Sequence, residues 1–97
     1  MNSSNMLAIV TGASTGIGFE LARQCANNGF DLLIAADEPE IHEAARRLEA
    51  EGAVVRAVEV NLATTEGVDK LLAAVASRPI DALLANAGRG LGHAFVD

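Results

Sequence analysis

The feature that most restricts the fold of this chain is the alternation of four short apolar runs with three segments of helical periodicity. The apolar runs occupy residues 6–10, 30–36, 53–60 and 80–86. The helical faces consist of Ile17, Leu21 and Cys25 beside Ala22 and Ala26, of Ile41, Ala44, Ala45 and Leu48, and of Val68, Leu71, Leu72 and Val75. Continuous apolar runs are typical of parallel strands that helices cover on both faces. The pattern predicts an α/β fold, an open parallel sheet of order β-α-β-α-β-α-β with right-handed crossovers.

Glycine and proline residues separate these segments. Gly29 is suited to the left-handed position that follows a helix, Gly52 ends the second helix and Pro79 stops the third. The last stretch, residues 87–97, is rich in glycine and shows no periodicity, so we expect a loop there. A length of 97 residues corresponds to one small domain.

Charge and cysteine content exclude several functions. The net charge is −6, which argues against binding nucleic acid through a basic face or an anionic membrane through a polybasic segment. Cys25 is the only cysteine and cannot form an internal disulfide bond. Neither Cys25 nor the two histidines, His42 and His93, have neighbours at metal-ligand spacing. With no signal peptide or membrane span visible, we expect a cytoplasmic protein without a metal site.

The first apolar run is followed directly by TGASTGIG, residues 11–18. A glycine-rich turn between a strand and a helix lets the backbone approach a phosphate, and the helix directs free N–H groups and the positive end of its dipole toward it. A P-loop is excluded, because that loop ends in Gly-Lys-Ser/Thr and the only lysine here is Lys70. The G-x-G-x-x-G pattern fits poorly, since Leu21 would occupy its third glycine. The remaining alternative is a tight turn that binds no ligand.

Two further motifs occur at the predicted strand ends. VNL, residues 60–62, closes the third run, and ANAG, residues 85–88, closes the fourth. Together with the glycine loop, they resemble the cofactor-binding motifs of the short-chain dehydrogenase/reductase family, in the same order. The resemblance extends from Met6 to about His93 and implies a Rossmann-like fold that binds a nicotinamide dinucleotide. One departure is Ala85, which stands where the family's N-N-A-G element has its first asparagine.

The resemblance implies a role for each matching residue. The pyrophosphate and the adenosine ribose would be surrounded by Gly12, Ser14, Thr15, Gly16, Ile17 and Gly18. Adenine would be flanked by Asn61 and Leu62. The fourth strand would be stabilised, and the cofactor contacted, by Asn86, Ala87 and Gly88.

The end of the second run favours NAD over NADP. A carboxylate at this position accepts a hydrogen bond from the ribose 2′-OH and repels a 2′-phosphate. The segment contains Asp37, Glu38 and Glu40 and no basic residue. Thr15 stands where NADP-preferring members of the resembled family often carry Arg or Lys. We therefore expect Asp37 to contact the ribose of NAD.

An alternative interpretation of Asp37 is structural. The sequence Asp37-Glu38-Pro39-Glu40 resembles a capping box, with Asp37 as N-cap, Glu40 three residues later and Pro39 in the first turn. The ribose-binding aspartate of the family also often falls one residue earlier, where this chain has Ala36. Both interpretations of Asp37 stay open, and one side chain can serve both purposes.

Catalytic residues of the resembled family are absent. That family uses Ser, Tyr and Lys from its second half, with tyrosine as general acid or base, whereas this chain contains no tyrosine. Lys70 lies in the third helical segment, and no serine follows the fourth run. We therefore predict no catalytic residue within residues 1–97, a single partial dinucleotide-binding domain truncated after the fourth strand.

The resulting hypothesis is the NAD(P)-binding portion of an oxidoreductase that would transfer hydride to or from a carbonyl or alcohol substrate. The alternative is a free-standing, non-catalytic dinucleotide-binding module. The apolar edge of the fourth strand, which ends an incomplete sheet, further predicts self-association.

Overall fold

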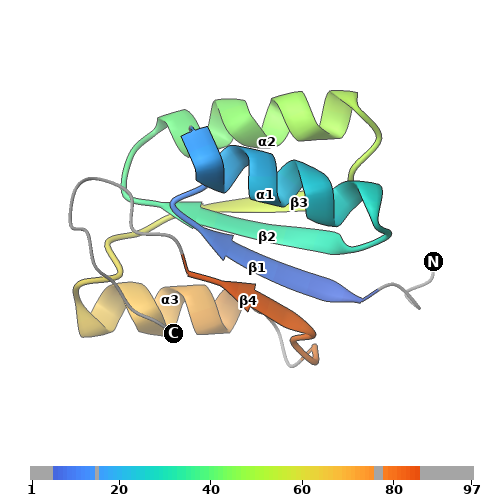
Figure 1. The fold of residues 1–97 in the computed structure, drawn as a ribbon. Helices are drawn as coiled ribbons and strands as arrows, with labels where there is room; N and C mark the ends of the chain where they lie inside the picture. The colour runs from blue at the N-terminus through green and yellow to red at the C-terminus, as the bar shows by residue number, and fades with distance from the viewer. Residues whose placement is uncertain (1–5, 15, 76–77, 86–97) are drawn as a thin grey trace.

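A four-stranded parallel sheet lies between helices on its two faces in the computed structural model, which describes residues 6–14, 16–75 and 78–85 (Figure 1). The elements are β1 (Leu7–Thr11), α1 (Gly16–Asn27), β2 (Asp31–Ala36), α2 (Glu40–Ala50), β3 (Val55–Glu59), α3 (Thr65–Val75) and β4 (Ala82–Leu84). The strand order is β3-β2-β1-β4. Helices α1 and α2 cover one face and α3 covers the other (Figure 1). The predicted element order and the parallel sheet are confirmed.

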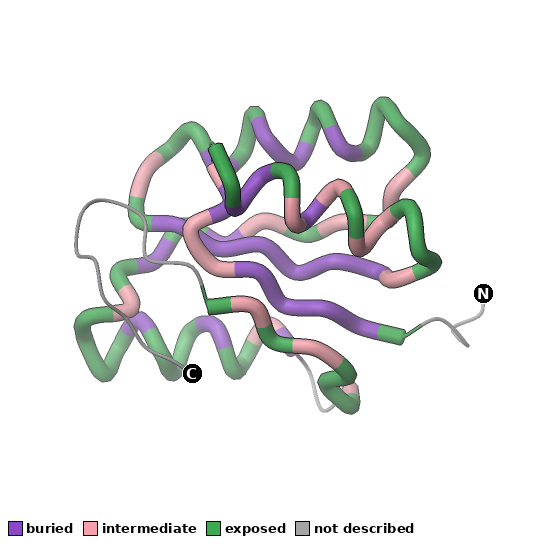
Figure 2. Tube along the Cα trace, viewed as in Figure 1, coloured by how far each residue is buried: buried purple, intermediate pink, exposed green. Residues whose placement is uncertain are grey.

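Strands β1 and β2 form the centre of the sheet and are almost wholly buried (Figure 2). Ile9 of β1 is in register with Leu33 of β2 and Leu83 of β4. Ile9 and Leu33 pack in the core on the α3 side, whereas the alternate residues, Val10 and Ile34, pack in the core under α1 and α2. Two apolar layers explain why these runs are continuously apolar rather than alternating.

The predicted helical faces agree with the structure to different extents. On α2, the face formed by Ile41, Ala44, Ala45 and Leu48 is buried as predicted. On α1, the buried residues are Gly18, Phe19 and Ala22, and Leu21 and Cys25 pack at the margin of the core. Ile17 is 72% exposed, so its assignment to the buried face is wrong. On α3, Leu71 and Val75 are buried, but Val68 and Leu72 are exposed, which corrects half of that predicted face.

Glycines occupy the two predicted positions after helices. Gly29, with a φ of 89°, and Gly52, with a φ of 97°, both follow a helix in the left-handed region. Helix α3 ends at Val75, before Pro79. Strand β4 is shorter than predicted, because its ladder with β1 covers only residues 82–84. No helix within the described parts of the chain is long and apolar enough to cross a membrane.

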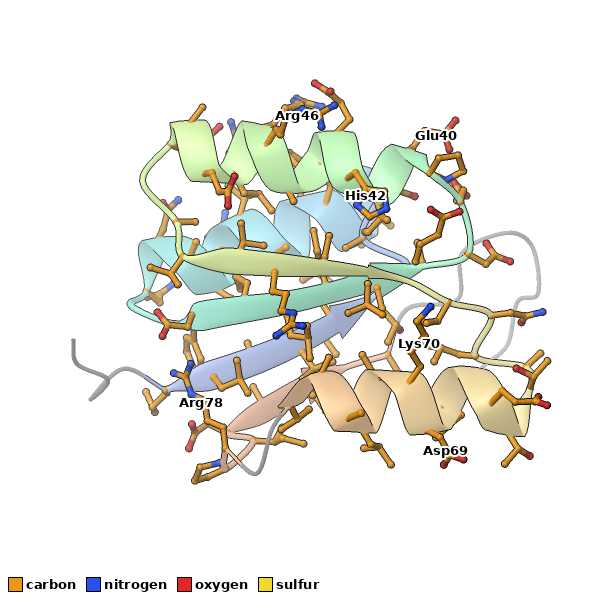
Figure 3. The ribbon with its side chains drawn as sticks, turned by 180° about the vertical axis from the view of Figure 1, so that it is seen from behind. Glu40, His42, Arg46, Asp69, Lys70 and Arg78 are labelled. Atoms are coloured by element: carbon orange, nitrogen blue, oxygen red, sulfur yellow. The ribbon has the colours of Figure 1, made fainter. Side chains whose placement is uncertain are left out.

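A cluster of charged groups fixes the start of β4 to the amino-terminal ends of the central strands. The Leu7 N–H donates to Oδ2 of Asp81 at 2.8 Å, and the Asp81 N–H donates to the Leu7 carbonyl at 2.9 Å. The Arg78 guanidinium lies 2.8 Å from Oδ2 of Asp31, the one charged residue buried among those described. Arg78 is labelled at this end of the sheet in Figure 3.

Candidate functional site

The loop that joins β1 to α1 lies at the carboxyl end of the sheet, where parallel α/β folds bind their ligands. Its first glycine, Gly12, has a φ of 63°, and Gly16 has a φ of 62°. Any other residue would cost about 1–2 kcal/mol in this left-handed region. The Gly12 N–H donates to the Ala35 carbonyl at 2.8 Å, which attaches the start of the loop to β2.

Helix α1 begins at Gly16 and presents its first turn at this loop. Its first turn contains no acidic side chain, so no carboxylate of the turn itself opposes an anion. Among the described residues, no atom lies within 4 Å of the position that a Cβ atom on Gly16 would take, which leaves open space over the loop backbone. Gly18 is buried and Ile17 is exposed beside it. The left-handed glycines, the open space and the helix N-terminus together fit a phosphate group.

A cavity of about 570 Å³ begins at the loop and follows α1. Its lining consists of Ser14, Gly16, Ile17, Phe19, Glu20, Leu21, Gln24 and Arg47. The Arg47 guanidinium lies over the Phe19 ring, 4.5 Å from its centroid, which joins α2 to α1 at the cavity wall.

The loop after β2 approaches the glycine loop through Glu38 rather than Asp37. The Ser14 hydroxyl donates to Oε1 of Glu38 at 3.1 Å, across 24 residues of sequence. Glu38 is half-buried, whereas Asp37 is exposed. The capping interpretation of Asp37 is wrong, because α2 begins at Glu40 and its N-cap is Pro39, without a side-chain cap hydrogen bond. Asp37 stands too far before the helix to cap it.

The end of β3 places Asn61 and Leu62 beside the start of α3. Oδ1 of Asn61 accepts the Ala63 N–H at 2.9 Å, and its carbonyl accepts the Thr64 hydroxyl at 2.9 Å. Asn61 is exposed, whereas Leu62 is half-buried and packs against the core under α3. The Gly67 N–H donates to Oγ1 of Thr64 at 3.0 Å, so Thr64 caps α3 and orders the turn that contains Asn61.

The predicted site residues are therefore partly assembled. The structure brings the loops after β1 and β2 together through Ser14 and Glu38, and joins β2 to the end of β3 through a hydrogen bond from the Val60 N–H to the Ala36 carbonyl. The predicted residues Thr15, Asn86, Ala87 and Gly88 lie outside the described residues. The Ser14–Glu38 contact was missed, and the only signal for it was the proximity of Glu38 to the end of the second apolar run.

Titratable groups with shifted pKa values lie on α1 and directly after α2. Burial raises the pKa of the Cys25 thiol on α1. A hydrogen bond from Arg23 lowers the pKa of the exposed Glu51 carboxyl. Nε2 of His42 lies 3.2 Å from Oε1 of Glu59, and both side chains are exposed (Figure 3 labels His42). No cluster of three metal-ligating side chains occurs among the residues that the structure describes.

Comparison with known proteins decides the family. The profile of the short chain dehydrogenase family matches residues 6–97. The chain belongs to the short chain dehydrogenase family. The match corresponds to the amino-terminal, cofactor-binding part of these enzymes, which confirms the resemblance inferred from the three motifs.

The chain spans about a third of the length of the relatives that it matches. The chain is 37% identical over 91 residues to 1-deoxy-11-beta-hydroxypentalenate dehydrogenase of Streptomyces arenae, and the alignment covers 91% of this chain and 32% of the relative. An actinorhodin polyketide ketoreductase with NADPH is 31% identical, with a TM-score of 0.85, over 97% of this chain and 38% of that chain. A short-chain dehydrogenase/reductase from Burkholderia phymatum in complex with NAD is 27% identical, with a TM-score of 0.76, over 81% and 29%. Other matched structures contain NADPH or NADP.

Proposed function

We propose that this chain binds a nicotinamide dinucleotide, as the cofactor-binding part of a short-chain oxidoreductase. The observation that carries the proposal is the glycine loop, in which two left-handed glycines, Gly12 and Gly16, open onto the N-terminus of α1. Such a loop supplies backbone N–H donors and a favourable dipole to a pyrophosphate without a charged side chain. When bound, the dinucleotide supplies the hydride chemistry, and this chain supplies its binding and orientation.

Each part of the dinucleotide has a group of residues that would hold it. The glycine loop would hold the pyrophosphate and adenosine ribose through Gly12, Ser14, Thr15, Gly16, Ile17 and Gly18. The turn after β3 would flank adenine through Asn61 and Leu62, whose position the Thr64 cap supports. The residues that follow β4, Asn86, Ala87 and Gly88, would pack against the cofactor.

NAD is the dinucleotide that the acidic loop after β2 favours. Asp37, Glu38 and Glu40 contribute three carboxylates and no basic group to that loop. A 2′-phosphate would be repelled there, whereas a 2′-OH finds hydrogen-bond acceptors. The relatives include structures with NADPH, NADP and NAD, so the choice depends on this chain's own residues.

The substrate of the whole protein would be a carbonyl compound or an alcohol, reduced or oxidised by hydride transfer. The chain contains no tyrosine, so a tyrosine general acid is not among its residues. We therefore expect no turnover from these 97 residues alone. The same observation supports the second candidate, a non-catalytic dinucleotide-binding module.

Isothermal titration calorimetry of the 97-residue chain with NAD and NADP tests the proposal. We expect saturable binding of both, with NAD bound more tightly. Titration with inorganic pyrophosphate separates recognition of the dinucleotide from simple anion binding. The absence of heat with either dinucleotide, from chain that circular dichroism shows to be folded, would contradict the proposal.

The edge of β4 further supports self-association. Leu83 lies in the edge strand of the described sheet and is 62% exposed. An exposed apolar edge strand favours pairing with another chain. Sedimentation velocity should show an oligomer, which Leu83→Lys should convert to monomer. If the chain without the substitution sediments as a monomer at all concentrations, this association is excluded.

A further inference from the structure

We propose that the outer edge of β3 binds an extended acidic segment of a partner protein, which adds to the sheet as a further strand. Strand β3 is an edge strand of the described sheet, at the opposite end from β4. Addition of a strand to an exposed sheet edge is a recurring mode of peptide binding, because the backbone supplies affinity and alternate side chains supply specificity.

Hydrogen bonds to β2 show which backbone groups of β3 face outward. The Leu32 N–H donates to the Val54 carbonyl at 2.9 Å, and the Val60 N–H donates to the Ala36 carbonyl at 2.9 Å. Because these directions alternate along a strand, the even-numbered residues of β3 face β2 and the residues between them face away from it. The outward residues are Val55, Ala57 and Glu59. No described strand pairs with this side, so their N–H and carbonyl groups can accept an added strand.

The α3 side of this edge presents two cations and an apolar side chain. Val58 and Val60 are buried in the core on the α3 side. Arg56 and Val54 lie on the same side, because alternate residues of a strand share a face. Both are exposed, Val54 by 64%. Lys70 is also exposed, and its side chain extends from α3 toward β3 (Figure 3).

Arg56 and Lys70 differ from the other cations of the described chain, because neither forms a hydrogen bond or an ion pair with a described residue. The other arginines that the structure describes have partners: Arg23 pairs with Glu20 and Glu51, Arg46 with Glu43, and Arg78 with Asp31, while Arg47 lies over Phe19. Carboxylates are not scarce, since the chain has thirteen acidic residues and seven basic ones. Two unpaired cations along an unpaired strand edge are complementary to a segment that carries acidic side chains.

The α2 side of the edge restricts where these acidic side chains can lie. Glu59 is on this side, and its Oε1 lies 3.2 Å from Nε2 of His42. An acidic residue that faced α2 would be repelled by Glu59. Side chains of an added strand alternate between the two faces, so the segment carries acidic residues at alternate positions with uncharged residues between them.

A second copy of this chain does not supply that pattern through its own β3. When two identical strands pair antiparallel around a two-fold axis, residues that oppose each other share a face of the sheet. Arg56 and Glu59 lie on opposite faces, so Glu59 of one copy cannot oppose Arg56 of the other. The occupant is therefore a segment of a different protein.

The probe is a capped heptapeptide with valine at both ends, glutamate at the third and fifth positions and threonine at the others. Its titration into the 97-residue chain is followed by NMR. We expect hydrogen exchange to slow at the amides of Val55 and Ala57, which gain acceptors. Exchange at Arg56 and Val58, whose amides face β2, should not change. A peptide with lysine in place of both glutamates should bind at least about tenfold more weakly.

Substitutions test the two cations and the backbone separately. Arg56→Gln and Lys70→Gln should each weaken peptide binding about threefold, and the double variant about tenfold, as expected for exposed ion pairs. Arg46→Gln removes an exposed cation from α2 and, as the matched control, should leave the affinity unchanged (Figure 3). Ala57→Pro removes an outward N–H at a position where an edge strand tolerates proline, and should abolish binding. Circular dichroism of each variant verifies folding.

Four results would overturn the assignment of this edge to an acidic segment. They are unchanged exchange at β3 with the peptide, slowed exchange confined to β4, equal binding of the lysine peptide, and the same shifts of the Val55 and Ala57 amides with inorganic phosphate. Shifts of these amides that depend on protein concentration without peptide would assign the edge to a second copy instead. No dinucleotide is present in these titrations, so their result is independent of the proposed function.

Discussion

The backbone of Gly67 in α3 lies directly against the carbonyl group of Asn61, and no side chain fits between them. A Cβ atom on Gly67 would overlap the Asn61 carbonyl and would approach Oγ1 of Thr64 to 3.1 Å. That carbonyl cannot easily move, because it also accepts hydrogen bonds from the N–H and the hydroxyl of Thr64. The first turn of α3 thus holds Asn61 in place, the residue that we propose lies beside adenine.

We predict that Gly67→Ala destabilises the protein, although Gly→Ala inside a helix normally stabilises by about 1 kcal/mol. The overlap with the Asn61 carbonyl should instead cost about 1–3 kcal/mol. Denaturant unfolding measures the difference. Asp69→Ala, at an exposed position of the same helix (Figure 3), is the control and should change stability by less than about 0.5 kcal/mol. A stabilised Gly67→Ala variant would show that α3 does not pack against Asn61 as described.

A second prediction concerns the glycine loop. Gly16→Val should abolish dinucleotide binding, because it fills the open space over the loop and strains a residue whose φ is 62°. Strain alone is tested by Gly29→Val. Gly29 also has a positive φ, of 89°, and no atom in the described part of the chain lies within 4 Å of the position that its Cβ would take. Both variants should lose about 1–2 kcal/mol of stability, but Gly29→Val should retain binding. Equal affinity of Gly16→Val and the unchanged chain would mean that the ligand binds elsewhere.

A third prediction concerns the carboxylate that fixes β4. Asp81→Ala removes the acceptor of the Leu7 N–H and should cost about 1–3 kcal/mol. Hydrogen exchange of the Leu7 amide, followed by NMR, should accelerate more than exchange in the helices. Asp81→Asn preserves an acceptor oxygen and should have a smaller effect on both measurements. Unchanged exchange at Leu7 in Asp81→Ala would exclude this bond as a determinant of local stability.

A fourth prediction concerns Cys25, whose thiol pKa is raised by burial. At mildly alkaline pH the folded protein therefore contains less thiolate than the unfolded chain, and iodoacetamide should alkylate Cys25 more slowly before than after denaturation. The raised thiol pKa also makes the stability of the folded protein depend on pH. The unfolded chain releases the thiol proton at lower pH, so the contribution of Cys25 is present below the unfolded pKa and is lost as pH rises through the folded pKa. Equal alkylation rates would indicate an exposed thiol.

How well each helix could be predicted depended on the width of its apolar surface. Helix α2 has one narrow apolar stripe, so the spacing of Ile41 and Leu48 identified its buried face correctly. Helix α1 is apolar around much of its circumference, and periodicity alone did not show that Phe19 rather than Ile17 faces the sheet. The outcome depends on how the helix is rotated over β1 and β2, which is a property of the tertiary structure.

The candidate site, like the helices, could be predicted only in part from the sequence. The glycine loop was predictable, because left-handed backbone positions require glycine wherever they occur, as at Gly12 and Gly16. The role of the acidic loop after β2, residues 37–40, could not be predicted in this way. Whether Asp37 caps α2 depends on where the helix begins, and whether Glu38 reaches Ser14 depends on a contact between residues 24 apart in sequence. Neither is determined by local pattern.

The position of β4 has a consequence for the order in which the chain assembles. The Leu7–Asp81 hydrogen bond joins residues 74 apart, whereas β1 pairs with β2 through residues such as Leu7 and Asp31. During synthesis, β1, β2 and β3 can therefore pair before β4 has left the ribosome. Until then, one edge of β1, a central strand of the sheet, is open to solvent and to neighbouring nascent chains. Chaperone dependence during translation should accordingly be greatest in the interval between completion of β3 and emergence of β4.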